Sequence, residues 1–341
     1  FGSSPSRLKR LCASDRASRW LQRAASAMGD AWRMDTLGLF ALATLMMALK
    51  PLLLHLTRPS EGAALPPEQF QLAAESLKLF MCSAVLLGRR ASGMKAPVWC
   101  GAAHTAPFAI PAAVYLLMNC LTVRAARLLA PPVFQLVANL KIICTAVASL
   151  VFLSRRLVPA QWLAMVLLTI GVALGQWSSA GADGLGAPSM LGVLLMVVNS
   201  CLSALGGVLT EKLLKGAASA ELPIFATNIH MAAHTLLVNG LVLGAQGTSW
   251  PSLPGASVGV ALVNEAVNGI LISVLMRRLD TIAKNFAFSL SVFITAGLSA
   301  GLLDYRPPIH FYLGAALATL AVLLFARPSA LTGILAKGKR Q

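Results

Sequence analysis

Six charged side chains lie within, or at the mouth of, segments that are otherwise apolar: Lys50, Glu75, Lys78, Lys141, Glu265 and Lys284. A charged group at the centre of a lipid bilayer costs at least about 2.5 kcal/mol, so such residues usually face a polar cavity or a partner. Glu75 and Lys78 are three residues apart and can form a structural charge pair on one helix face. Lys141 has no carboxylate close in sequence, so either Glu75 or Glu265 of another helix, or a bound anion such as a phosphate, would satisfy it. The lysines therefore predict an internal anion-binding site.

Uncharged polar residues occur at the same depth in other apolar segments. Gln135 and Asn139 are four residues apart beside Lys141, so they share one helix face, as a polar stripe lining a cavity would. The further members of this set are Tyr115, Asn119, Asn199, Asn228, His230, Asn264 and Asn268. Each of them alone is more often an interhelical hydrogen bond than a ligand contact. Together with the lysines, they describe a site that can bind a base, a ribose and a phosphate.

The histidines and cysteines do not form a pattern typical of a metal site. His230 and His234 are four residues apart, but no third ligand and no HExxH sequence accompanies them. The six cysteines are scattered and contain no CxxC, so we interpret them as small packing residues. We therefore predict no metal and no cofactor.

The segments that must position these residues are long and apolar. Hydrophobic residues make up 57% of the chain, charged residues only 12%, and the mean hydropathy is +0.74. About 20 apolar residues in a helix cross the hydrocarbon core of a bilayer. The sequence therefore predicts an all-α polytopic membrane protein with ten transmembrane helices, at residues 36–56, 70–87, 106–123, 132–153, 160–177, 189–209, 222–244, 256–276, 284–303 and 311–326. The long apolar block 128–153 has no breaker after Pro132 and is expected to form one helix.

The distribution of Lys and Arg predicts how these spans are oriented. Ten spans place both termini on one side, and that side receives twenty Lys and Arg residues against four on the other. Cytoplasmic loops retain positive residues, so both termini are predicted to be cytosolic. The net charge of +16 therefore reports membrane topology, and we predict no nucleic-acid partner.

Spans four and five resemble spans nine and ten. Each pair is separated by a charged loop that ends in proline, at residues 154–159 and 304–308. The offset of five spans is odd, so it predicts two inverted five-helix repeats with a site near the membrane midplane. We divide the chain into a ten-helix domain at 36–326 and two basic cytosolic tails, 1–35 and 327–341. The first tail is predicted to be disordered, with a plastid-type transit segment as the alternative.

Several long motifs resemble the nucleotide-sugar transporter family, in the branch of the CMP-sialic acid and UDP-galactose transporters. Plant-type members similar to CMP-sialic acid transporters look closest. The resemblance covers most of residues 36–326 and is carried by AESLKLF, PAAVYLLMN, FQLVANLKIICTA, QWLAMVLLTIGVALGQW, GGVLTEKLLK, NIHM and NGILISVLMRRLDTIAKNFAFSLS.

This resemblance implies the drug/metabolite transporter fold and a Golgi membrane location, with the endoplasmic reticulum or a plastid envelope as alternatives. It implies antiport of a cytosolic nucleotide sugar against a lumenal nucleoside monophosphate, and a homodimer is compatible with it. Carried over by position, the residues of the nucleotide site are Lys78, Tyr115, Asn119, Lys141, Asn228 and Lys284. Phe134, Ala138 and Met118 depart from the residues usual in animal members, as does Asn268 where a glycine is usual, and these departures concern the choice of sugar.

Two other classes compete with this interpretation. An exporter of drugs or small metabolites could share the fold, although a pump for cationic or apolar compounds would not need buried lysines. A membrane enzyme would need reactive groups that the chain lacks, because no paired intramembrane aspartates and no Ser-His arrangement occur. We therefore predict a transporter and no enzymatic activity.

Overall fold

The computed structural model describes residues 34–56, 67–94, 105–129, 131–155, 157–176, 189–216, 222–245, 256–302 and 307–327. All regular structure in these ranges is helical: α2 (Met34–Leu56), α3 (Pro67–Ala91), η1 (Ala106–Phe108), α5 (Ala109–Leu128), α6 (Pro131–Ala138), α7 (Leu140–Phe152), α8 (Pro159–Gln176), α9 (Met190–Lys215), α11 (Ile224–Ala245), α12 (Ala256–Arg278), α13 (Thr281–Leu302) and α14 (Ile309–Ala326). The predicted tails lie outside the described residues, apart from Met34, Asp35 and Arg327 at their inner ends.

The length and composition of these helices confirm an all-α polytopic membrane protein. Six of the described helices are long and apolar enough to cross a bilayer: α2, α3, α9, α12, α13 and α14. Shorter apolar helices cover Ala106–Thr122, Leu140–Phe152 and Pro159–Gly175. The remaining long helix, α11, carries two histidines and two asparagines, which lower its hydropathy.

The expectation of one helix over residues 128–153 is wrong. Helix α5 ends at Leu128, and the prolines that begin α6 cannot donate backbone hydrogen bonds to the preceding turn. A turn at Asn139 then separates α6 from α7. There the N–H of Ile142 donates to the carbonyl of Asn139 at 3.0 Å, three residues back instead of four. The break lies two residues before Lys141, so it helps to set the direction of that side chain.

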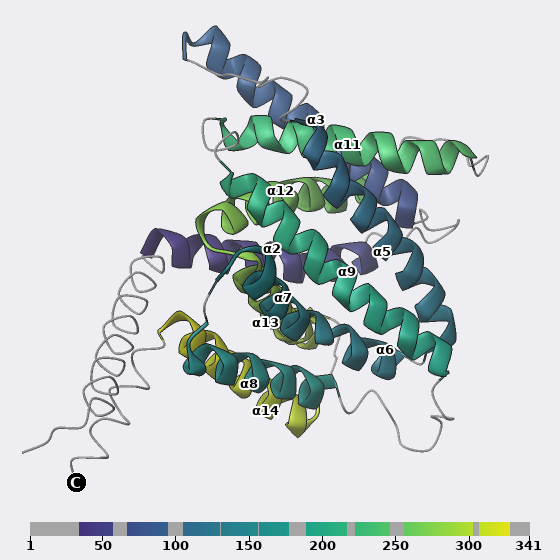
Figure 1. The fold of residues 1–341 in the computed structure, drawn as a ribbon, viewed down its shortest axis with the longest axis vertical. Helices are drawn as coiled ribbons and strands as arrows, with labels where there is room; N and C mark the ends of the chain where they lie inside the picture. Colours follow the sequence, from purple (N-terminus) through teal and green to yellow (C-terminus); the bar gives the residue numbers. More distant parts are fainter. Residues whose placement is uncertain are drawn as a thin grey trace, which may run out of the picture.

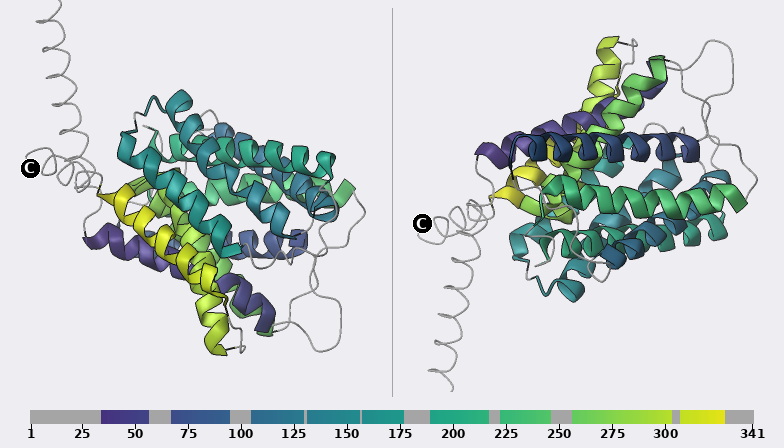
Figure 2. Two further views of the ribbon diagram at one scale, coloured as in Figure 1. Left: turned by 90° about the horizontal axis from the view of Figure 1, so that it is seen from below. Right: turned by 90° about the horizontal axis from the view of Figure 1, so that it is seen from above.

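The helices pack as a bundle of close pairs (Figure 1). Helix α8 lies along α14. Helix α3 lies along α11, as the view from above in Figure 2 also shows. Helix α9 contacts α5 and α7, while α2 contacts α12 and α13. The crossing of α8 and α14 depends on glycine, because a Cβ atom on Gly171 would lie 2.8 Å from the carbonyl oxygen of Gly314. Small residues at such crossings let membrane helices approach closely.

The largest buried apolar cluster joins α2, α7, α8, α12, α13 and α14. Two aromatic pairs lie within it: the rings of Phe286 and Phe325 stack with their centroids 4.7 Å apart, and those of Phe293 and Phe311 are tilted with their centroids 5.3 Å apart. This cluster holds α13 against α7, and these are the two helices that carry Lys284 and Lys141.

Candidate anion-binding site

Lys141 and Lys284 approach each other from α7 and α13. The Nζ atom of Lys141 lies 3.6 Å from the ring centroid of Phe288, and Phe288 follows Lys284 by one helical turn on α13. Lys141 therefore meets α13 about one helical turn from Lys284. Neither of them forms an ion pair with a carboxylate in the part of the chain that the structure describes. Two neighbouring ammonium groups without a carboxylate are suited to hold an anion.

Glu75 and Glu265, the carboxylates considered as partners of Lys141, form ion pairs with other lysines. Glu75 pairs with Lys78 on its own helix, with 2.5 Å between Oε2 and Nζ. Glu265 of α12 pairs with Lys50 of α2, with 2.8 Å between Oε1 and Nζ. Lys141 is therefore held by the aromatic face of Phe288, a cation–π contact worth about 0.5–2 kcal/mol.

Two consecutive glycines on α9 bring Tyr115 and Lys284 to the same place. A Cβ atom on Gly206 would lie 3.3 Å from the ring of Tyr115, and one on Gly207 would lie 3.4 Å from Nζ of Lys284. Gly207 also accepts a hydrogen bond from the Thr281 hydroxyl through its carbonyl oxygen, at 2.9 Å. The missing side chains let Tyr115 of α5 and Lys284 of α13 contact neighbouring residues of α9.

Buried acids fix the start of α13 and thereby place Lys284 in its first turn. Asp280 accepts a hydrogen bond from the N–H of Ala283 at 2.6 Å and pairs with Arg155 at 2.7 Å. Glu211 of α9 accepts from the N–H of Thr281 at 2.8 Å. Burial alone would lower the pKa of Arg155, but the charge of Asp280 outweighs it and raises that pKa above its usual value. These contacts lock α9, α13 and the segment after α7 together.

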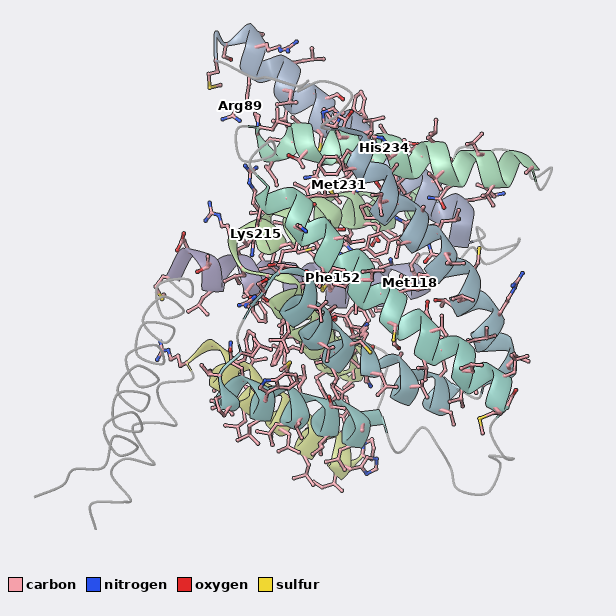
Figure 3. The ribbon with its side chains drawn as sticks, in the orientation of Figure 1. Arg89, Met118, Phe152, Lys215, Met231 and His234 are labelled. Atoms are coloured by element: carbon pink, nitrogen blue, oxygen red, sulfur yellow. The ribbon has the colours of Figure 1, made fainter. Side chains whose placement is uncertain are left out.

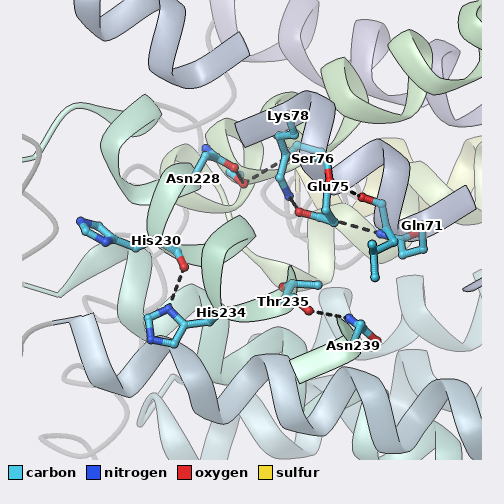
Figure 4. Close-up of polar contacts among 12 residues, drawn as sticks. Gln71, Glu75, Ser76, Lys78, Asn228, His230, His234, Thr235 and Asn239 are labelled. Carbon is cyan, nitrogen blue, oxygen red and sulfur yellow. Dashed lines mark hydrogen bonds and ion pairs between the residues drawn. The ribbon is translucent and has the colours of Figure 1, made fainter. Parts of the chain in front are cut away.

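A second polar cluster joins α3 to α11 and α12 (Figure 4). Gln71 donates to Oε1 of Glu75 at 3.3 Å, while Lys78 pairs with the other oxygen of the same carboxylate. Lys78 lies against α12, because a Cβ atom on Gly269 would be 3.2 Å from its Cδ atom. The predicted charge pair of Glu75 is thus present in the structure.

Asn228 is buried between α11 and α12 and uses its amide within the protein. Its Nδ2 donates to the carbonyl of Ile224 at 2.9 Å, and its Oδ1 accepts from the hydroxyl of Ser273 at 2.8 Å. On the same helix, Nδ1 of His234 lies 2.8 Å from the carbonyl oxygen of His230 (Figure 4). Among the described residues, no group of three or more potential metal ligands was found.

The remaining predicted site residues differ in their surroundings. Asn139 and Asn268 are each about 5% exposed, and one atom of each, Nδ2 and Oδ1 respectively, is buried without a hydrogen-bond partner in the protein. Asn119 is exposed on α5. Gln135 belongs to α6, but its side chain lies outside the described part.

Sequence reasoning missed Phe288 and the pair Gly206 and Gly207. A glycine pair in the middle of an apolar helix is itself a signal of close approach, because glycine destabilises a helix interior. Phe288 carried no comparable signal, since an aromatic residue in an apolar helix is ordinary.

These features define a multi-pass membrane protein in which Lys141 and Lys284 have no carboxylate partner among the described residues. The sequence model described as "Nucleotide-sugar transporter" matches residues 33–326 of this chain. The chain therefore belongs to the nucleotide-sugar transporter family.

Known relatives and one solved structure resemble the chain over most of its length. The "Probable UDP-sugar transporter protein SLC35A4" of Bos taurus is 32% identical, with 83% of this chain and 91% of the relative covered. The "UDP-galactose translocator" of Mus musculus is 33% identical over 75% of this chain and 69% of its own length. The "UDP-galactose/UDP-N-acetylglucosamine transporter srf-3" of Caenorhabditis elegans is 29% identical over 67% of this chain and 63% of its own length, which is under two thirds. A crystal structure with 16% identity superposes with a TM-score of 0.65 over 86% of this chain and 98% of that one, and this likeness concerns the fold alone.

Proposed function

We propose that this chain is an antiporter that exchanges a nucleotide sugar for a nucleoside monophosphate, with the phosphates held between Lys141 and Lys284. The observation that carries the proposal is the position of Lys141 over Phe288, one helical turn from Lys284, with neither lysine paired to a carboxylate among the described residues. A phosphate supplies the missing negative charge and can accept hydrogen bonds from both ammonium groups. Phe288 would hold Lys141 while the site is empty.

Other residues around the lysines suit the rest of a nucleotide. Tyr115 lies against Gly206, the neighbour of the glycine that Lys284 contacts, and its ring could stack on a base or a ribose. Asn139 has a buried amide donor without a hydrogen-bond partner among the described residues. The sequence adds Lys78, Asn119, Gln135 and Asn228 to the proposed substrate-binding set, with Asn268 at its end away from the phosphates. The names of the relatives favour a UDP-sugar such as UDP-galactose as the first substrate to test. A CMP-sialic acid-like substrate is the second.

The lysine charges explain why entry of a nucleotide sugar should be coupled to exit of a monophosphate. An empty site would carry two adjacent lysine charges through the closed state, where desolvation costs several kcal/mol for each ion. A bound nucleotide neutralises them, so the loaded carrier changes sides more easily than the empty one. This asymmetry is the physical basis of antiport by alternating access.

The helix contacts support a ten-helix arrangement of two inverted five-helix repeats. With α6 and α7 taken as one span, each span of the first half corresponds to the span five positions later. The main contacts between the halves then have equivalents with the roles of the halves exchanged. The contact of α2 with α12 corresponds to that of α9 with α5, α2 with α13 corresponds to α9 with α7, and α3 with α12 corresponds to α11 with α5. The pairs α3 with α11 and α8 with α14 map onto themselves. Such a pattern is typical of a two-fold axis through the middle of the bundle.

We further propose a Golgi membrane location with both termini in the cytosol. The Lys and Arg distribution supports this orientation. Figure 3 draws Arg89 and Lys215, which belong to the predicted cytosolic ends of α3 and α9, toward the same end of the bundle. A homodimer is compatible with the exposed apolar faces of α8 and α14, as is direct contact with lipid.

Uptake into liposomes that contain the purified chain tests this function. Labelled UDP-galactose, UDP-N-acetylglucosamine and CMP-sialic acid would be offered to vesicles that are empty or preloaded with UMP or CMP. We expect uptake only into vesicles preloaded with the matching monophosphate. Equal uptake into empty vesicles would contradict antiport, and no uptake of any nucleotide sugar would contradict the proposed substrate class.

A further inference from the structure

The ion pair between Lys50 and Glu265 lies apart from the two lysines of the anion site. It joins α2 to α12, with 2.8 Å between Lys50 Nζ and Glu265 Oε1. The side chain of Lys50 is 37% exposed and that of Glu265 is 16% exposed. An ammonium group that is exposed inside an apolar span is tolerated where it meets a polar space rather than lipid tails. The pair therefore borders a space that can hold polar atoms.

Two hydrogen-bond acceptors beside this pair have no donor. Oε2 of Glu265 and Oδ1 of Asn268 are both buried, and neither has a hydrogen-bond partner in the protein. The two residues are three apart on α12, so they share one helix face. By contrast, the amide of Asn264 is used within the protein, because it donates to the carbonyl of Met46 at 3.1 Å. Leaving buried acceptors unpaired costs free energy, which a ligand with hydroxyl donors would recover.

The level of this pair along the bundle can be read from α13. The hydroxyl of Thr295 donates to the carbonyl of Ala48 at 2.9 Å, two residues before Lys50. Thr295 is seven residues after Phe288, which marks the level of Lys141. A helix rises about 1.5 Å per residue, so the pair lies roughly 10 Å further along the bundle than the lysine site. This is the scale of the distance between a nucleotide phosphate and the far hydroxyls of an attached hexose.

The opposite charges of Lys50 and Glu265 disfavour charged ligands at this position. A cation would be repelled by Lys50, and a second phosphate would be repelled by Glu265. A neutral polyol is repelled by neither charge, and its hydroxyls can donate to Glu265 and Asn268 and accept from Lys50. Ordered water could donate to the same acceptors, and the effect of removing these acceptors on nucleotide-sugar binding distinguishes water from a polyol.

We propose that Lys50, Glu265 and Asn268 form the subsite for the sugar of the transported molecule, with Glu265 and Asn268 accepting hydrogen bonds from its hydroxyls. This inference rests on the proposed function, because it assumes that a nucleotide occupies the lysine site. It assigns discrimination among sugars to α2 and α12, and discrimination for the nucleotide to α5, α7 and α13.

Paired binding measurements on the full chain test the subsite. The dissociation constants of UMP and UDP-galactose, and of CMP and CMP-sialic acid, would be measured by thermal shift or calorimetry for the unmodified chain, Asn268→Ala and Glu265→Gln. Loss of a hydrogen bond to a ligand hydroxyl should weaken binding of the matching nucleotide sugar by about tenfold, more for the charged acceptor. Binding of the monophosphate should stay unchanged, which also shows that the variant is folded.

A matched control is Asn264→Ala, which removes a neighbouring amide already bonded to Met46. We expect it to affect the monophosphate and the nucleotide sugar equally. If Asn268→Ala and Glu265→Gln also weaken both ligands equally, or weaken neither, the acceptors hold water or serve the fold, and the subsite is refuted. If the unmodified chain binds none of the four nucleotides, the proposed function itself fails.

Discussion

The two lysine clusters of this protein differ in where their counter-charges come from. Lys78 has a carboxylate one helical turn away, and Glu75 satisfies it at 2.5 Å within the same helix. Lys141 has no carboxylate among its described contacts, and it lies over the ring of Phe288, one helical turn from Lys284. A lysine paired within its own helix contributes to the fold even where it also lines a substrate site, whereas an unpaired buried lysine is stabilised by a bound anion. Removing a charge should therefore damage stability in the first cluster and binding in the second.

The largest effect is expected for Glu75→Gln, which leaves Lys78 buried without its partner. Breaking a buried ion pair from one side typically costs about 3–5 kcal/mol, so the melting temperature of the purified protein should fall markedly. The double variant Glu75→Gln with Lys78→Met removes both charges and should recover most of the loss. A single variant that melts like the unmodified chain would mean that this pair does not contribute to the fold.

Lys141→Met should weaken nucleotide binding while leaving the empty protein intact. A charge-assisted contact to phosphate is worth about 1.5–3 kcal/mol, which corresponds to a roughly ten- to hundredfold rise in the dissociation constant. The melting temperature without ligand should stay the same or rise, because a desolvated charge is removed. The comparison breaks down if this variant is destabilised without ligand yet keeps its full thermal shift with UMP or CMP.

Gly207→Ala should disturb the meeting point of α9 and α13. The added Cβ atom would lie 2.5 Å from Cγ2 of Thr281 and 3.4 Å from Nζ of Lys284, so the helices must separate. Overpacking of this kind costs about 1–3 kcal/mol, and nucleotide binding should weaken with it. Gly297→Ala on α13 is the matched control, since a Cβ atom there meets nothing within 4 Å. Equal behaviour of the two variants would contradict the close approach at Gly207.

The smallest effect is expected for Arg278→Gln. Arg278 pairs with Asp35 at 3.1 Å, but the two side chains are 54% and 64% exposed. Exposed pairs contribute about 0–1 kcal/mol, so stability and transport should both change little. A loss comparable to that of Glu75→Gln would show that exposure is a poor guide to the value of ion pairs in this protein.

The amino-acid sequence by itself determined the class of protein, and it predicted an anion site. Transmembrane spans depend on local composition and length, and both can be read directly from the sequence. The pair Glu75 and Lys78 could be predicted because helix geometry alone brings residues three apart together. The prediction that Lys141 binds an anion followed from the absence of a nearby carboxylate in the sequence.

Tertiary structure decided every contact that joins different helices. Lys50 finds Glu265 across 215 positions of sequence, Lys141 lies over Phe288, and Gly206 admits Tyr115. These contacts depend on the rotation and register of each helix against its neighbours, which periodicity within a single helix does not determine. Periodicity also did not predict the turn at Asn139, because no proline or glycine marks the break between α6 and α7. The position of each helix in the bundle, more than the residues it contains, sets which polar atoms are left for a substrate.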